Sequence, residues 1–106
     1  RRIFAELCKA VGWLHGVGLV HRDIKLESNY AFPASAKSPS LPASSQPLVK
    51  LTDFGLSRFI DPAKPLLTTR CGSEAYAAPE LVSESAGGYD ARETDAWACG
   101  VVLYAL

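Results

Sequence analysis

Apolar side chains recur at helical spacing near the start of the chain, with charged residues between them. These apolar positions are Ile3, Phe4, Leu7, Cys8, Val11 and Leu14. At 3.6 residues per turn they share one face, so the pattern predicts an amphipathic helix of about four turns. Gly16 and Gly18 predict its end. We expect this helix to pack against a core and to orient the loop that follows.

Two short apolar runs predict strands, at Leu19-Val20 and over residues 48–52. Each run leads into a polar segment, and loops held by rigid elements are the usual place for catalytic groups. Later in the chain, residues 80–83 predict a short helix and residues 87–89 a turn.

Residues 95–106 predict a final, central helix with Thr94 or Asp95 as its N-cap. This segment is apolar on every side except at Gly100. Such a helix belongs in a core, and it is too short to span a bilayer.

Composition changes abruptly over residues 33–47, where nearly every residue is Pro, Ser or Ala. Such a segment buries too little apolar surface to offset its ordering entropy, so we interpret it as a flexible insertion. An inert spacer is the simplest role. A proline-directed phosphorylation site at Ser38-Pro39, or recruitment of an SH3-type domain, are alternatives.

Charge and cysteine content narrow the class of protein. The chain has 106 residues, no Met, and 11 basic against 11 acidic residues. The balance gives no indication of nucleic-acid or membrane binding. Its three cysteines lack metal-ligand spacing, which favours reduced thiols and an intracellular location, in cytoplasm or nucleus. Without Met, and with no signal segment at its start, we expect an internal piece of a longer protein.

The candidate chemistry lies in two polar segments. Asp23 and Lys25 stand two residues apart after the first strand, and Asp53 follows the second, flanked by Phe54 and Gly55. Phosphoryl transfer requires an acceptor for the substrate hydroxyl proton, a cation for the moving phosphate and a carboxylate for Mg²⁺. These three side chains suit those needs.

Three motifs in order, HRDIKLESN (21–29), TDFGLSR (52–58) and AYAAPE (75–80), resemble the catalytic domain of eukaryotic serine/threonine protein kinases. The resemblance implies an α+β fold: the mainly helical large lobe of a kinase domain, incomplete, over residues 1–106. Its catalytic loop would be residues 19–29 and its activation segment residues 53–80. The family's Gly-rich loop, strand Lys and the Glu partner of that Lys are not in this sequence.

The resemblance implies ATP and Mg²⁺ as cofactors. Asp23 would accept the proton, Lys25 would hold the phosphoryl group and Asp53 would bind Mg²⁺. The remaining implied roles are His21 packing under Phe54, Gly55 giving backbone freedom, Ser73 near the substrate hydroxyl, Glu80 anchoring the substrate loop, and Asp95 bonding the catalytic-loop backbone.

One position departs from the family pattern, which expects Asn as the fifth residue after the catalytic Asp. Ser28 stands there and Asn29 follows one place later. Either a one-residue bulge brings the Asn29 amide oxygen to the second Mg²⁺, or the Ser28 hydroxyl ligates it less well. We favour Asn29.

The segment LLTTRCGSEAYAAPE (66–80) resembles the activation loops of AMP-activated and calcium/calmodulin-dependent kinases. The resemblance implies phosphorylation at Thr69, with Thr68 second, and pairing of the phosphate with Arg22. Ordinary loop threonines are the alternative.

We expect a parent protein that phosphorylates Ser or Thr of protein substrates. Its partners would be those substrates, an upstream activating kinase and the missing N-terminal lobe, with no nucleic acid and no membrane. A pseudokinase-like scaffold with an impaired metal site is the alternative, and a truncated gene product without function is a third. We expect residues 1–106 alone to be inactive and poorly soluble.

Overall fold

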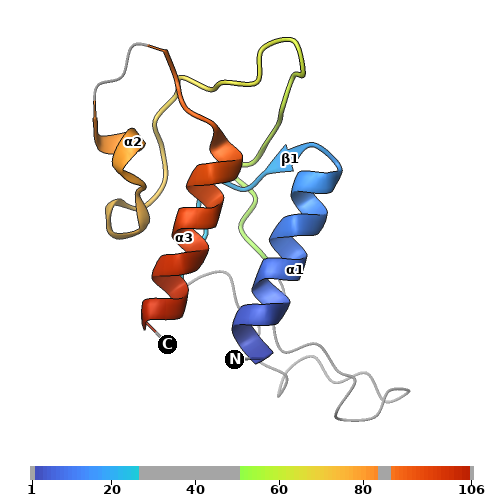
Figure 1. Ribbon diagram of the computed structural model, residues 1–106, viewed down its shortest axis with the longest axis vertical. Helices are drawn as coiled ribbons and strands as arrows, with labels where there is room; N and C mark the ends of the chain where they lie inside the picture. Colours follow the sequence, from blue (N-terminus) through green and yellow to red (C-terminus); the bar gives the residue numbers. More distant parts are fainter. Residues whose placement is uncertain (1, 27–50, 84–86, 106) are drawn as a thin grey trace.

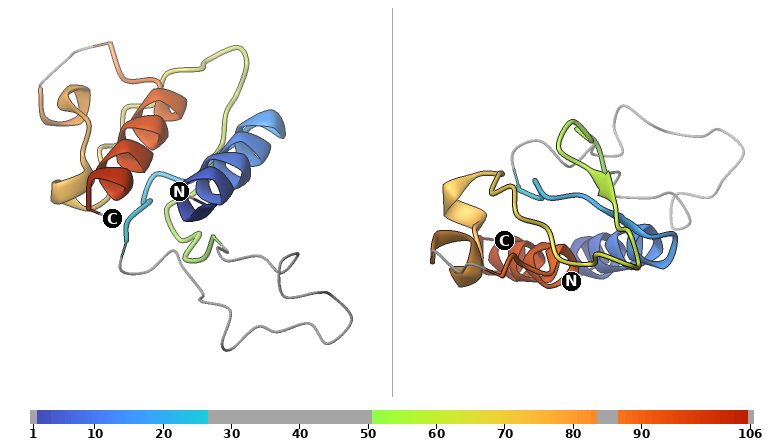
Figure 2. Two further views of the ribbon diagram at one scale, coloured as in Figure 1. Left: turned by 60° about the horizontal axis from the view of Figure 1, so that its bottom comes forward. Right: turned by 90° about the horizontal axis from the view of Figure 1, so that it is seen from above.

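The computed structural model describes residues 2–26, 51–83 and 87–105 of the chain. Two long helices, α1 (Arg2–Gly16) and α3 (Ala91–Ala105), lie side by side and run in opposite directions (Figure 1). The two short strands lie on one face of this helix pair (Figure 2), and the short helix α2 (Pro79–Val82) lies beside α3 (Figure 1). The fold is therefore α+β, as predicted.

Helix α1 confirms the helix predicted from the first apolar pattern, although Cys8, one of the apolar positions, is exposed. Its buried residues are Leu7, Val11 and Leu14, and an Arg2–Glu6 ion pair of 3.0 Å lies one turn apart near its start. The helix ends at Gly16, and Gly18 takes a φ of +86°, a left-handed conformation that glycine adopts without steric cost. The chain then turns directly into strand β1 (Leu19–Val20).

Strand β1 was predicted, but its partner was not. Its antiparallel partner is β2 (Arg58–Phe59), with Leu19 opposite Phe59 and Val20 opposite Arg58. The strand predicted over residues 48–52 is wrong at Leu51 and Thr52, which are irregular; residues 48–50 lie outside the described residues. Leu51 instead packs against the core cluster between the long helices, and the Thr52 carbonyl accepts a hydrogen bond from a side chain.

Helix α3 begins at Ala91, four residues earlier than the predicted start at 95. Asp90 supplies hydrogen-bond acceptors for the N–H groups in the first turn of α3. The Asp90 carbonyl accepts from the N–H groups of Glu93 and Thr94, and Asp90 Oδ1 accepts from the Arg92 N–H at 3.0 Å. Neither Thr94 nor Asp95 is the cap, because both lie inside the helix and Asp95 binds elsewhere. The short helix predicted over residues 80–83 is confirmed as α2, one residue earlier.

The core is divided into two clusters. One lies between α1 and α3 and consists of Leu7, Val11, Ile24, Ala98, Cys99 and Val102. The other joins β1 to the start of α3 and consists of Val20, Leu67, Tyr89 and Ala91. Val20 and Ile24 thus anchor the two sides of the HRD segment, which fixes the position of residues 21–23.

Helix α3 is not enclosed on all sides, contrary to the sequence prediction. Trp97 is 48% exposed and Tyr104 is 93% exposed, whereas Ala98, Cys99 and Val102 are buried. All three cysteines are free thiols. No helix in the described part of the chain is long and apolar enough to cross a membrane.

Candidate active site

The backbone of the HRD segment is held by Asp95 of α3. Asp95 Oδ2 accepts from the His21 N–H at 2.8 Å and Oδ1 from the Arg22 N–H at 2.9 Å, and Asp95 is 1% exposed. Arg22 has a φ of +70°, a conformation that costs a non-glycine residue about 1–3 kcal/mol. Hydrogen bonds to a buried carboxylate are among the stronger ones, so they can hold this strained backbone in place.

His15 is a further hydrogen-bond partner of the Asp95 carboxylate. Its Nε2 lies 2.9 Å from Asp95 Oδ2, and it comes from the last turn of α1. Asp95 therefore joins α1, the HRD segment and α3 at one point. The sequence analysis did not select His15. The one available signal was its place at the end of the helix that precedes the loop.

His21 is fully buried and both of its ring nitrogens are engaged. Nε2 lies 2.9 Å from the Thr52 carbonyl, and Nδ1 accepts from the Asp23 N–H at 3.2 Å. This pattern requires the neutral tautomer with its proton on Nε2. The ring packs against Phe54 at a centroid distance of 5.0 Å. His21 thus connects the HRD and DFG segments and has no free nitrogen for proton transfer.

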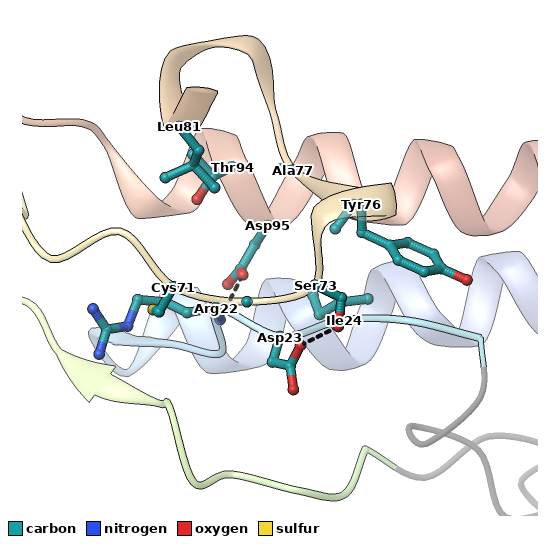
Figure 3. A pocket seen from close by; sticks show the side chains of 12 residues that line it. Arg22, Asp23, Ile24, Cys71, Ser73, Tyr76, Ala77, Leu81, Thr94 and Asp95 are labelled. Carbon is teal, nitrogen blue, oxygen red and sulfur yellow. Dashed lines mark hydrogen bonds between the residues drawn. The ribbon is translucent and has the colours of Figure 1, made fainter. Parts of the chain in front are cut away.

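Three side chains converge at the front of the catalytic loop. Ser73 Oγ donates to Asp23 Oδ1 at 3.2 Å, and Lys25 Nζ donates to Ser73 Oγ at 3.3 Å. Lys25 Nζ is also 3.8 Å from Asp23 Oδ2. Figure 3 shows the Asp23 and Ser73 side chains pointing toward one another across the two loops. The Asp23 carboxylate and the Lys25 ammonium group therefore both contact the hydroxyl of Ser73.

Gly72 allows the activation segment to approach the catalytic loop closely. Its φ is +100°, and a Cβ at this position would lie 2.7 Å from the Arg22 carbonyl oxygen. The space left between the two segments is about 20 Å³ and is lined by Asp23, Ser73 and Asp95, among others. It has room for about one water molecule and none for a nucleotide.

The Arg22 side chain lies near the predicted phosphorylation site at Thr69. Its Nε donates to the Leu56 carbonyl at 2.7 Å, and its Nη1 lies 3.5 Å from the hydroxyl of Tyr89. That hydroxyl in turn donates to the carbonyl of Thr69. Thr68 instead lines a separate hollow with Arg58 and Lys64, at the end of β2.

The predicted metal ligands are only partly described. Asp53 is exposed and has a φ of +59°, whereas Gly55 is not in the left-handed region, so the unusual backbone lies at the Asp and not at the glycine. Ser28 and Asn29 lie outside the described residues. Among the residues that are described, no group of three His, Cys, Asp or Glu side chains could hold a metal ion. Glu80 is half-buried in α2.

Comparison with known proteins identifies the family of the chain. The model of the protein kinase domain matches residues 1–106. Serine/threonine-protein kinase KIN4 of Saccharomyces cerevisiae is 42% identical over 105 residues, which is 99% of this chain and 12% of that protein. CBL-interacting serine/threonine-protein kinase 14 of Arabidopsis thaliana is 39% identical over 108 residues, 100% of this chain and 21% of that protein.

A mouse relative extends the comparison. Testis-specific serine/threonine-protein kinase 5 of Mus musculus is 37% identical over 106 residues, which is 100% of this chain and 25% of that protein. The chain thus spans between 12% and 25% of the length of these three relatives.

Proposed function

The chain belongs to the protein kinase domain family, and from this premise we propose that its parent protein transfers the γ-phosphoryl group of ATP to Ser or Thr hydroxyls of proteins. The observation that carries the proposal is the convergence of Asp23 Oδ1 and Lys25 Nζ on the hydroxyl of Ser73. The three relatives named above are all serine/threonine kinases by name, which supports the choice of acceptor.

In this proposal a substrate hydroxyl lies beside Asp23 much as Ser73 does. The substrate oxygen forms a bond to the γ-phosphorus, the bond from that phosphorus to the ADP oxygen breaks, and the hydroxyl proton passes to the Asp23 carboxylate. Lys25, which donates to Ser73 Oγ, would lie beside the substrate hydroxyl as well and offset the negative charge of the transferring group as a point charge. Ser73 keeps both side chains aligned from the activation segment.

Asp53 is the proposed magnesium ligand among the described residues. Its exposed carboxylate supplies the oxygen donors that Mg²⁺ prefers. Asn29, or Ser28 in its place, is the proposed second protein ligand. When bound, Mg²⁺ neutralises charge on the nucleotide phosphates. The Gly-rich loop and strand Lys that would hold the nucleotide belong to the missing N-terminal lobe in this proposal.

Phosphorylation of Thr69 is the proposed activating event. A phosphate adds about 1.5 to 2 negative charges at pH 7 and can pair with an arginine. The Arg22 guanidinium and the Thr69 carbonyl both contact the Tyr89 hydroxyl, so Arg22 is close to this threonine. Thr68 remains the second choice, with Arg58 and Lys64 lining the same hollow. An upstream kinase in the same intracellular compartment would act on this segment.

The direct test is Mg²⁺-dependent phosphorylation of a generic Ser/Thr peptide by the full-length parent, with Asp23→Asn as the variant. Loss of the proton acceptor should lower kcat by about 10²–10⁴-fold. Asp61→Asn is the matched control, because Asp61 is exposed and its carboxylate accepts from the nearby Ala63 N–H, which an Asn amide oxygen can also do. A parent phosphorylated at Thr69 that transfers no phosphate would overturn the proposal and favour the scaffold.

The same assay tests the metal assignment. Asn29→Ala should raise the Mg²⁺ concentration required for half-maximal rate, while Ser28→Ala should not, because a carboxamide oxygen is the stronger ligand. The reverse result would move the ligand role to Ser28.

A further inference from the structure

Tyr89 has an unusual position outside the residues of the proposed reaction. It is 3% exposed, and its side chain lies in the core cluster of Val20, Leu67 and Ala91. Its hydroxyl nevertheless makes two polar contacts: it donates to the Thr69 carbonyl, and it lies 3.5 Å from Arg22 Nη1. A phenol has one donor and can also accept, so a single hydroxyl serves both partners.

The backbone of Tyr89 is fixed independently of its side chain. The Tyr89 N–H donates to the Leu67 carbonyl at 2.8 Å, and the Leu67 N–H donates to the Tyr89 carbonyl at 2.9 Å. Gly88 has a φ of +84°, and a Cβ there would lie 2.7 Å from the Leu67 carbonyl oxygen. Leu67 of the activation segment is therefore joined to Tyr89 by two backbone hydrogen bonds, and Gly88 lies close to Leu67, so the backbone that carries the Tyr89 ring is held in place.

Arg22 is also held by residues other than Tyr89. Its N–H donates to Asp95 and its Nε to the Leu56 carbonyl, and its Nη1 lies 3.5 Å from the Tyr89 hydroxyl. One hydroxyl thus contacts both Thr69 and Arg22, and the backbone of Arg22 adjoins Asp23.

We propose that Tyr89 is a positioning residue that couples the state of the activation segment at Thr69 to the catalytic loop through Arg22. The proposal deepens the function given above, because it rests on Thr69 as the site of phosphorylation. Because the Tyr89 hydroxyl contacts both the Thr69 carbonyl and Arg22 Nη1, the Thr69 backbone and the Arg22 guanidinium lie close together before any phosphate is added. Preorganisation of this kind reduces the ordering entropy lost when the phosphate and the arginine pair.

The test uses the full-length parent with Tyr89→Phe, which keeps the buried ring and removes only the hydroxyl. Tyr104→Phe is the control, since Tyr104 lies near the end of α3 and is 93% exposed. The activity of Thr69-phosphorylated enzyme is divided by that of unphosphorylated enzyme. We expect Tyr89→Phe to lower this activation ratio about three- to tenfold, the effect of one hydrogen bond, and Tyr104→Phe to leave it unchanged.

Amide hydrogen exchange gives a second readout that does not depend on catalysis. Tyr89→Phe should speed exchange over residues 68–71 and over residues 21–24, and phosphorylation of Thr69 should no longer slow exchange in the second segment. In an Arg22→Met background, Tyr89→Phe should have no further effect on residues 21–24, because the route through Arg22 is already lost.

These outcomes separate the inference from the proposed function. An inactive wild-type parent would remove the kinase proposal, and hydrogen exchange would then decide the coupling by itself. Unchanged exchange over residues 21–24, or additive effects of the Arg22 and Tyr89 substitutions there, would overturn the coupling. So would equal losses of activity in the phosphorylated and unphosphorylated enzymes, which would indicate general stability alone.

Discussion

At the scale of single residues, the geometry of the site is set by polar side chains that contact the same partner, as Asp23 and Lys25 both contact Ser73. Asp23, Lys25 and Ser73 could be selected from the sequence because each falls at a fixed offset inside a motif, and the structure brings the three together. His15 and Tyr89 could not be selected. Each owes its place to a contact across 80 or 67 residues of chain, respectively, and no local pattern encodes such a contact.

Asp95 carries the clearest prediction at this scale. Asp95→Asn in the parent kinase keeps one oxygen acceptor but turns an NH₂ group toward backbone N–H donors, which leaves a buried donor unsatisfied. We expect a loss of about 2–4 kcal/mol in the free energy of unfolding and a lower kcat. Urea denaturation with activity assays checks both. Asp90→Asn is the control, because Asn caps a helix as well as Asp does; equal effects of the two variants would contradict this role for Asp95.

At the scale of elements, periodicity predicted the helices and failed at their edges and at strand pairing. Helix α1 was found because its buried residues follow a 3.6-residue period. The start of α3 was missed because Asp90 caps it ahead of a polar first turn, where no apolar period begins. Strand β2 was missed because Arg58 and Phe59 are both exposed and show no alternation, so their pairing with β1 leaves no pattern in the sequence.

Gly72 lies where the activation segment meets the catalytic loop, and its substitution tests how closely these two segments must approach. Gly72→Ala in the parent places a methyl group 2.7 Å from the Arg22 carbonyl oxygen at a φ of +100°. We expect about 1–2 kcal/mol of strain and, because the activation segment must shift, a fall in kcat on the order of 10²-fold. Gly16→Ala should leave kcat unchanged, since nothing lies within 4 Å of its added Cβ. Retention of full activity by Gly72→Ala would show that the close approach is dispensable.

The packing of α1 against α3 makes a separate prediction about thiol reactivity. Burial, with smaller effects from Cys8 and Asp95, raises the pKa of the Cys99 thiol to about 12, from an ordinary value of 9.0. Below pH 9 Cys99 is a thiol in both the folded and unfolded states, so its ionisation does not affect stability. Between pH 9 and about 12 only the unfolded state ionises, and stability falls as pH rises.

Alkylation followed by mass spectrometry checks the Cys99 assignment directly. With iodoacetamide at mildly alkaline pH, the exposed Cys8 should react first and Cys99 should react only after denaturation. Cys8→Ser serves as the control, because it removes the fast site and should leave the native protein with no rapid reaction on α1. Rapid labelling of Cys99 in the folded parent would contradict its burial.

At the scale of the whole molecule, the described residues leave substantial apolar surface in contact with solvent. Trp13 is 67% exposed, Trp97 48% and Tyr104 93%. A hollow of about 460 Å³ on α3 is lined by Ala96, Trp97, Gly100, Val101 and Tyr104. Contiguous apolar patches of this kind are uncommon on monomeric soluble proteins. The sequence pattern wrongly predicted that α3 is buried on every side. Apolar composition alone does not distinguish a helix enclosed on all sides from one enclosed on a single face.

The isolated chain of residues 1–106 is therefore expected to self-associate and to show no ATP-dependent transfer. Exposed apolar surface on α1 and α3 drives association, and the sequence contains no Gly-rich loop or strand Lys to hold the nucleotide. Light scattering across a concentration series measures the first effect, and phosphate transfer to a peptide measures the second. Replacing both Trp97 and Tyr104 by Lys should reduce association without restoring transfer, because charge interrupts the patch but supplies no nucleotide site. A monomeric, catalytically competent fragment would show that the two long helices and the catalytic loops suffice for both stability and chemistry.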